Sequence, residues 1–163
     1  MLFRYLFLLF MVLILSASSS FAGRTAGFKK EGQTGSLVRY SGSVILEGKY
    51  LYSRLQEDRE MIGDQVCFYP SHKDAGLIPR ENDKRAPWFC FNDTKRAKEA
   101  LLLSMLLNDP KVCSVEGSAT LEISNYVVDR AETNTNDTAD LVRVIDLSKP
   151  ATKQFTKSGA ECK

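Results

Sequence analysis

Alternating apolar and polar residues predict that most of this chain forms β-strands. Successive side chains of a strand point to opposite faces, so a period of two indicates one buried and one exposed face. Gly42 and Gly48 interrupt the first alternating stretch, and glycines inside a strand are typical of a bend or a bulge. The sequence therefore predicts five strands, at residues 38–54, 65–70, 87–92, 112–130 and 139–147.

One helix is predicted between the third and fourth strands. Asn92 and Asp93 end the third strand, and such residues offer a side-chain oxygen that caps the first turn of a helix. Residues 94–107 place their apolar side chains on roughly one side, and Pro110 ends the helix. That apolar side consists of Ala97, Ala100, Leu101, Leu103 and Leu107.

Residues 1–22 have the pattern of an export signal. Arg4 supplies a positive charge, an apolar run follows, and small residues precede Ala22. We expect cleavage after Ala22. The apolar run has about 11 residues, which is short for a membrane span of roughly 20. A retained membrane anchor is the alternative, and no membrane span is expected after cleavage.

The remaining chain is predicted to form one domain with two irregular ends. Residues 23–36 are rich in glycine and small polar residues and are expected to be a flexible leader. Residues 37–147 form the predicted domain, and 148–163 a lysine-rich tail. The chain has 22 Lys and Arg residues, one of them in the signal, against 20 Asp and Glu. This balance argues against a nucleic-acid partner.

Four cysteines behind an export signal indicate two disulfides, for which three pairings exist. If the second and third strands pair as a hairpin, one register places Cys67 opposite Cys90 and also places the apolar residues of both strands on one face. We therefore expect a Cys67–Cys90 disulfide. By elimination, Cys113–Cys162 ties the tail to the domain.

The order of three strands, one helix and two further strands resembles the OB-fold. This superfold is a five-stranded Greek-key barrel, and the resemblance covers residues 37–147. It rests on the order of the elements and on a glycine-bearing first strand. The resemblance implies a mainly β protein that binds ligands across its second and third strands and the flanking loops.

The sequence offers little equipment for catalysis. His72 is the only histidine, and no nucleophile motif lies near it. One histidine and four cysteines without a C-x-x-C pair do not form a zinc site. The acidic runs at 57–60 and 129–140 are interpreted as solvated loops. We therefore assign no catalytic residue, no metal site and no cofactor.

The linker between the second and third strands is the candidate binding segment. It is longer than an ordinary hairpin loop, and Arg80, Lys84 and Arg85 make it basic. Tyr69 and Trp88 flank it and are candidates for stacking against a ligand. The alternative for Trp88 is that it covers the disulfide.

These features favour an exported, non-enzymatic binding module, periplasmic or secreted. Its expected partner is a protein or a small anionic ligand of the cell envelope. The alternative function is a small secreted hydrolase or enzyme inhibitor acting on cell-envelope carbohydrate. Its candidate carboxylates are Glu57, Asp58 and Glu60.

Overall fold

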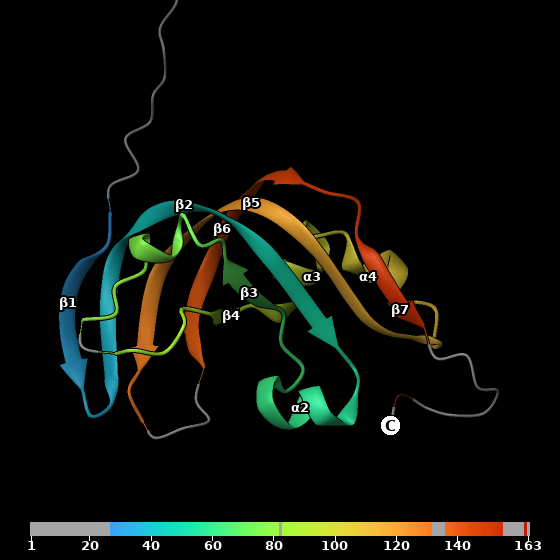
Figure 1. Ribbon diagram of the computed structural model, residues 1–163, viewed down its shortest axis with the longest axis horizontal. Coiled ribbons are helices and arrows are strands. Elements are labelled where there is room, and N and C mark those ends of the chain that lie inside the picture. The colour runs from blue at the N-terminus through green and yellow to red at the C-terminus, as the bar shows by residue number, and fades with distance from the viewer. Residues whose placement is uncertain (1–26, 82, 132–135, 155–161, 163) are drawn as a thin grey trace, which may run out of the picture.

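The computed structural model describes residues 27–81, 83–131, 136–154 and 162. The predicted signal peptide and its cleavage site lie outside these residues. The described chain is mainly β (Figure 1). Its strands are β1 (Lys29–Thr34), β2 (Leu37–Ser53), β3 (Cys67–Pro70), β4 (Phe89–Phe91), β5 (Val112–Asp129), β6 (Asp137–Leu147) and β7 (Ala151–Gln154).

Five of the strands form a closed ring of hydrogen-bonded neighbours. The order around the ring is β2, β3, β4, β6 and β5, and β5 pairs with β2 to close it. The β4–β6 pair is parallel, and the other pairs are antiparallel. β1 extends β2 and β7 extends β5 outside the ring. In Figure 1, the long β2 and β5 curve side by side across the molecule.

A glycine allows β2 to bend. Gly42 has a φ of 99°, a conformation that L side chains rarely adopt. The pairing of β2 with β5 shifts register between Tyr40 and Ser43, on either side of this glycine. The expected bend or bulge in the first predicted strand is therefore confirmed.

The core lies inside the ring, where alternate residues of each strand point inward. Val44, Leu46 and Tyr50 of β2 are buried in this way, as are Leu121 and Ile123 of β5. The predicted helix closes the ring at the end that holds the C-terminus of β2. It consists of two short helices, α3 (Thr94–Ala100) and α4 (Leu103–Leu106).

The predicted start of the helix is confirmed, but its continuity is wrong. The Asp93 side chain accepts a hydrogen bond from the backbone N–H of Arg96, which caps α3. The helix stops at Ala100 because Leu102 adopts a left-handed conformation with φ of 57°. This turn buries Leu101 and Leu103 in the core and exposes Leu102.

Three segments expected to be irregular contain regular elements. The predicted leader, 23–36, includes β1, and the predicted tail, 148–163, includes β7. The acidic run at 57–60 lies in α2 (Gln56–Ile62) rather than in a loop. β1 and β7 are polar and short, so their sequences lack a clear apolar alternation. Pairing with the long strands β2 and β5 forms them instead.

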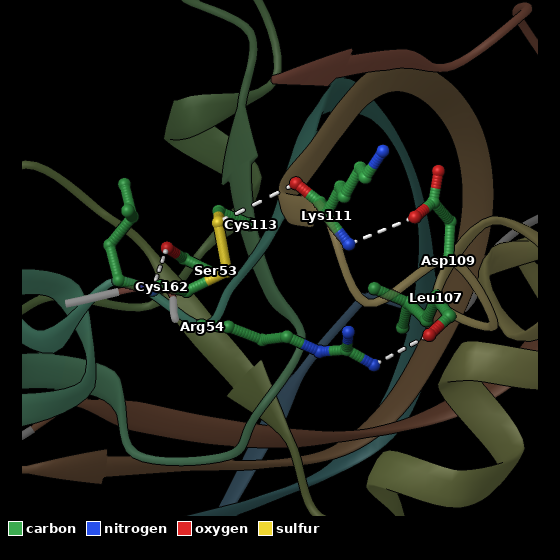
Figure 2. Close-up of a disulfide and its surroundings, with 8 residues drawn as sticks. Ser53, Arg54, Leu107, Asp109, Lys111, Cys113 and Cys162 are labelled. Atoms are coloured by element: carbon green, nitrogen blue, oxygen red, sulfur yellow. Dashed lines mark hydrogen bonds between the residues drawn. A yellow bond between two sulfur atoms is a disulfide. The ribbon is translucent and has the colours of Figure 1, made fainter. Parts of the chain in front are cut away.

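Both predicted disulfides are confirmed. Cys67 pairs with Cys90 and Phe68 with Phe89 in the β3–β4 register, and the Cys67–Cys90 bond crosses these strands. Cys113 at the start of β5 is bonded to Cys162 (Figure 2). Within the described residues, no helix has the length and apolar character needed to cross a membrane.

Candidate functional site

The long loop, residues 71–88, is tied to the ring at both of its ends. Near its start, the backbone N–H of Ser71 donates to the carbonyl of Glu47, and the carboxylate of Asp74 accepts from the N–H of Glu47. Ile78 is buried in the core. The following residues cover the end of the ring opposite α3 and α4. Because the loop packs against the ring, some of its basic side chains face the protein rather than the solvent.

Arg80 and Arg85 face carboxylates of the protein itself. Arg80 lies 2.8 Å from the Asp137 carboxylate and 3.1 Å from that of Asp83. Arg85 also pairs with Asp83, and it donates to the backbone carbonyl of Asp129 at 2.6 Å. These pairs fasten the loop to the ends of β5 and β6. Lys84, the third predicted basic residue, is exposed and has no ion pair within the described residues.

The carboxylate of Asp137 is the most deeply buried member of this cluster. Its side chain is 1% exposed, and it accepts hydrogen bonds from the Tyr126 hydroxyl and the Asp129 N–H. Burial raises the pKa of Asp137, while the hydrogen bonds and the charge of Arg80 oppose this. Asp137 begins β6, so the prediction of a solvated loop at 129–140 is wrong for residues 137–140. The prediction failed because Asp137 pairs with Arg80, which comes from a distant segment of the chain.

A second charged group ties the long loop to two strands and to the residue that follows β5. Glu81 accepts hydrogen bonds from Lys30 of β1 at 2.9 Å and from Tyr40 of β2 at 3.0 Å. It also pairs with Arg130, which follows β5. The hydrogen bonds from Arg130, Lys30 and Tyr40 lower the pKa of Glu81 to about 2. Glu81 thus stays ionised and holds the loop against the sheet.

The two predicted aromatic residues lie together on the outer face of the ring. The rings of Tyr69 and Trp88 stack with centroids 5.8 Å apart and planes 9° from parallel. Trp88 packs against a cluster containing Cys67 and Cys90, so it covers the disulfide, as the alternative interpretation predicted. Tyr69 is 37% exposed and is the member of the pair that is more open to solvent.

Tyr69 belongs to a line of outward-facing residues that crosses the strands. Lys49 of β2 pairs with Tyr69 on one side and with Ser118 of β5 on the other. The Ser148 hydroxyl accepts a hydrogen bond from the Ser118 backbone N–H and donates one to the Ser118 carbonyl. We call Trp88, Tyr69, Lys49, Ser118 and Ser148 the outer row. Lys49 is exposed and has no ion pair within the described part of the chain.

Two hollows flank the centre of the outer row. The first has a volume of about 320 Å³ and is lined by Lys49, Tyr69, Pro70, Ser71 and Ser118, together with Glu47 and Gly48. The second has a volume of about 200 Å³ and is lined by Lys49, Glu116, Gly117, Ser118, Ser148, Lys149 and Ala151. Lys49 and Ser118 belong to both linings. The hollows are therefore neighbours on either side of the Lys49–Ser118 pair.

The residues that sequence reasoning missed here are Lys49, Ser118, Ser148 and Lys149. Alternation along the first predicted strand places Lys49 on the face opposite Tyr50 and Val44. It does not tell which residues of other strands stand beside Lys49, because that depends on the register of β2 with β3 and β5. No local motif marks the position.

The candidate carboxylates of the alternative function all lie on α2 but do not all line one cavity. Glu60 lines a cavity of about 900 Å³ with Asp64 and Arg54, whereas Glu57 and Asp58 do not line it. Burial raises the pKa of Asp64, but hydrogen bonds from Tyr52 and Lys98 outweigh this and lower it. Figure 2 shows Arg54 at this end of the molecule, donating to the Leu107 carbonyl beside the Cys113–Cys162 disulfide.

The arrangement on the outer row combines an aromatic face, an ammonium group and hydroxyl groups around two shallow hollows. Such groups are able to contact an apolar face of a ligand and to form hydrogen bonds with its polar groups. Comparisons of the chain with protein-family models, with curated proteins and with solved structures find no match.

Proposed function

We propose that this protein is an exported, non-enzymatic binding module that holds a small anionic ligand on the outer row. The observation that carries the proposal is the first hollow, where Tyr69 and Lys49 line one space of about 320 Å³. Lys49 has no ion pair among the residues that the structure describes. Small-molecule sites have volumes of roughly 300–1,000 Å³ and combine apolar walls with a few polar groups. The ligand therefore has an apolar face and an anionic group.

We further propose that the ring is an OB-like Greek-key barrel. Its support is the closure of β2 on β5, the parallel β4–β6 pair and the placement of α3 and α4 between β4 and β5. In this proposal β3 and β4 are the second and third strands, which commonly carry the binding face of OB-folds. Tyr69 lies on β3, and Trp88 directly precedes β4.

Export to an oxidising compartment is part of the same proposal. Both pairs of cysteines are disulfide-bonded, and such bonds persist mainly outside the cytosol. The sequence pattern of residues 1–22 supports export independently. The two together support a periplasmic or secreted location.

The internal ion pairs of the long loop favour Lys49 over Arg80 and Arg85 as the partner of the anionic group. Arg80 and Arg85 are engaged by Asp83 and Asp137, so binding an external anion there requires breaking internal ion pairs. Lys49 has no ion pair within the described residues, so no such pair has to be broken when it binds an anion. A protein partner with an acidic side chain beside an apolar one meets the same chemistry and is an alternative occupant.

The first prediction tests this site with defined probes. Calorimetric titration with benzoate, glucuronate and inorganic phosphate is expected to show binding of the ring-bearing anions. Lys49→Gln is expected to weaken that binding about tenfold or more, because a hydrogen bond to a charged group contributes roughly 1.5–3 kcal/mol. Lys95→Gln, at an exposed position of α3, is the matched control and keeps full affinity.

Three results would contradict the proposal. If none of these probes binds, the outer row is not a site for small anions. If Lys84→Gln weakens binding and Lys49→Gln does not, the site is on the long loop. Turnover of peptidoglycan that is lost in Glu60→Gln would replace the binding proposal with the hydrolase alternative.

A further inference from the structure

We infer that the occupant of the outer row is an acidic oligosaccharide that crosses β3, β2 and β5 and fills both hollows. This inference rests on the proposed binding function and names the class of ligand. It starts from the shared lining of the two hollows, since Lys49 and Ser118 contribute to both. A ligand in one hollow therefore reaches the other without leaving the surface.

The length of the outer row exceeds a single ring. Tyr69, Lys49, Ser118 and Ser148 occupy successive positions across the sheet. Neighbouring strands lie about 4.8 Å apart, so these four residues span roughly 14 Å. A ligand with one ring occupies the first hollow only. Linked rings that run across the strands contact the whole row.

The mixture of charges in the hollows requires a ligand that both donates and accepts hydrogen bonds. Lys49 and Lys149 are donors and attract an anion. Glu116 is an exposed acceptor in the second lining, and Glu47 in the first lining is exposed and paired with Lys73 through one carboxylate oxygen. Ionised carboxylates accept only. A carbohydrate supplies hydroxyl donors for the carboxylates, and its acid groups meet the lysines.

Serine residues line both hollows. Ser71 lines the first hollow, but its hydroxyl is covered by surrounding atoms and has no hydrogen-bond partner within the described structure. Covered polar groups are nearly always paired, so a rotation of this side chain that pairs it with a ligand hydroxyl would be favourable. At the other end of the row, Ser148 lines the second hollow, and its hydroxyl is already paired with the Ser118 backbone.

The aromatic pair offers one flat surface of fixed orientation. Stacking on Trp88 holds the Tyr69 ring, which lines the first hollow beside Pro70. The negative face of an aromatic ring attracts the polarised C–H groups of a sugar ring. A phosphodiester chain fits less well, because its phosphate groups carry a negative charge at every link and are repelled by Glu116, and because the protein is nearly neutral.

Calorimetry with galacturonate and its tetramer tests the inference, with the carboxyl-reduced neutral tetramer as the ligand control. The acidic tetramer is expected to bind at least tenfold more tightly than galacturonate. Lys149→Gln is expected to remove most of that gain, because it alters the second hollow. Lys153→Gln, an exposed position of β7 outside both linings, is expected to keep the gain.

The outcomes separate this inference from the proposed function. Equal affinities for galacturonate and its tetramer would reject the extended occupant and leave the binding function standing. Equal affinity for the neutral tetramer would reject the need for acid groups. Tighter binding of polyphosphate, single-stranded DNA or an acidic peptide would assign another class of ligand. No binding of any small anion would remove the proposed function itself.

Discussion

At the scale of single residues, two glycines of the ring are required by the side chains beside them. Gly48 of β2 lies under the Phe68 ring, and Gly117 of β5 lies opposite Tyr50, whose ring covers it. A Cβ atom at Gly48 would lie 2.3 Å from the backbone oxygen of Tyr69. Neither glycine has a positive φ, so close packing rather than backbone conformation explains them.

Alanine at these glycines is therefore expected to destabilise the protein. Gly48→Ala should lower the free energy of unfolding by about 1–3 kcal/mol or more, because a backbone atom has to move. Gly117→Ala should cost less than Gly48→Ala, since a side chain, Tyr50, can shift. Urea denaturation measures both. Gly76→Ala, where nothing lies within 4 Å of the added Cβ, is the control and should change stability by less than about 0.5 kcal/mol. Equal effects at all three positions would refute the packing explanation.

At the scale of elements, the long loop is held by charges that come from distant parts of the chain. Glu81 joins the loop to β1, β2 and the residue after β5. The arginines of the loop form ion pairs with Asp83 and Asp137. The hydrogen bond from Arg85 lowers the pKa of Asp83, and the partners of Glu81 lower its pKa to about 2. Both carboxylates are thus bound in the ionised form, which makes the loop sensitive to acid.

Glu81→Gln is expected to reduce stability at neutral pH but not in strong acid. The pKa of Glu81 in the folded state, about 2, lies below its ordinary value of 4.5. Its contribution is therefore complete above pH 4.5 and is lost as the pH falls toward 2. Urea denaturation between pH 7 and 2 should show the difference between the two proteins disappearing over that interval. Glu57→Gln, an exposed position of α2, is the control. A difference that is constant with pH would mean that Glu81 acts through packing instead.

At the scale of the whole molecule, the two disulfides fasten different parts of the ring. Cys67–Cys90 joins adjacent strands 23 residues apart and is buried beneath Trp88. Cys113–Cys162 joins the start of β5 to a residue 49 positions later. Each bond restricts the unfolded chain, and the longer loop loses more entropy when it is closed.

Removal of either disulfide is expected to lower the free energy of unfolding by about 2–4 kcal/mol. The two variants should differ in the fluorescence of Trp88, the only tryptophan. Cys67→Ala/Cys90→Ala should change the native emission, because Trp88 packs against the cluster that contains both cysteines. Cys113→Ala/Cys162→Ala should leave the native emission unchanged. Denaturant titration followed by fluorescence and circular dichroism measures both effects. An unchanged emission in the first variant would show that Trp88 does not cover the disulfide.

Features that depend on neighbouring residues were determined by the sequence itself. Alternation along the chain predicted the five strands of the ring, and Asp93 predicted the start of α3. The Cys67–Cys90 pair was also predictable, because a single register satisfies both the cysteines and the phenylalanines of β3 and β4. In each case the physical cause is local, either the two-residue period of a strand or the unpaired N–H groups of a first helical turn.

Features that join distant segments were decided only by the tertiary structure. Asp137, which lies far along the chain, pairs with Arg80 and neutralises its charge. The basic sequence of the long loop therefore does not form a basic surface at Arg80. The outer row depends in the same way on the register that sets Lys49 between Tyr69 and Ser118. The two-residue period of a strand gives the face on which a side chain lies. The packing of the closed ring decides which strand lies beside that side chain, because the ring brings together strands from distant parts of the chain.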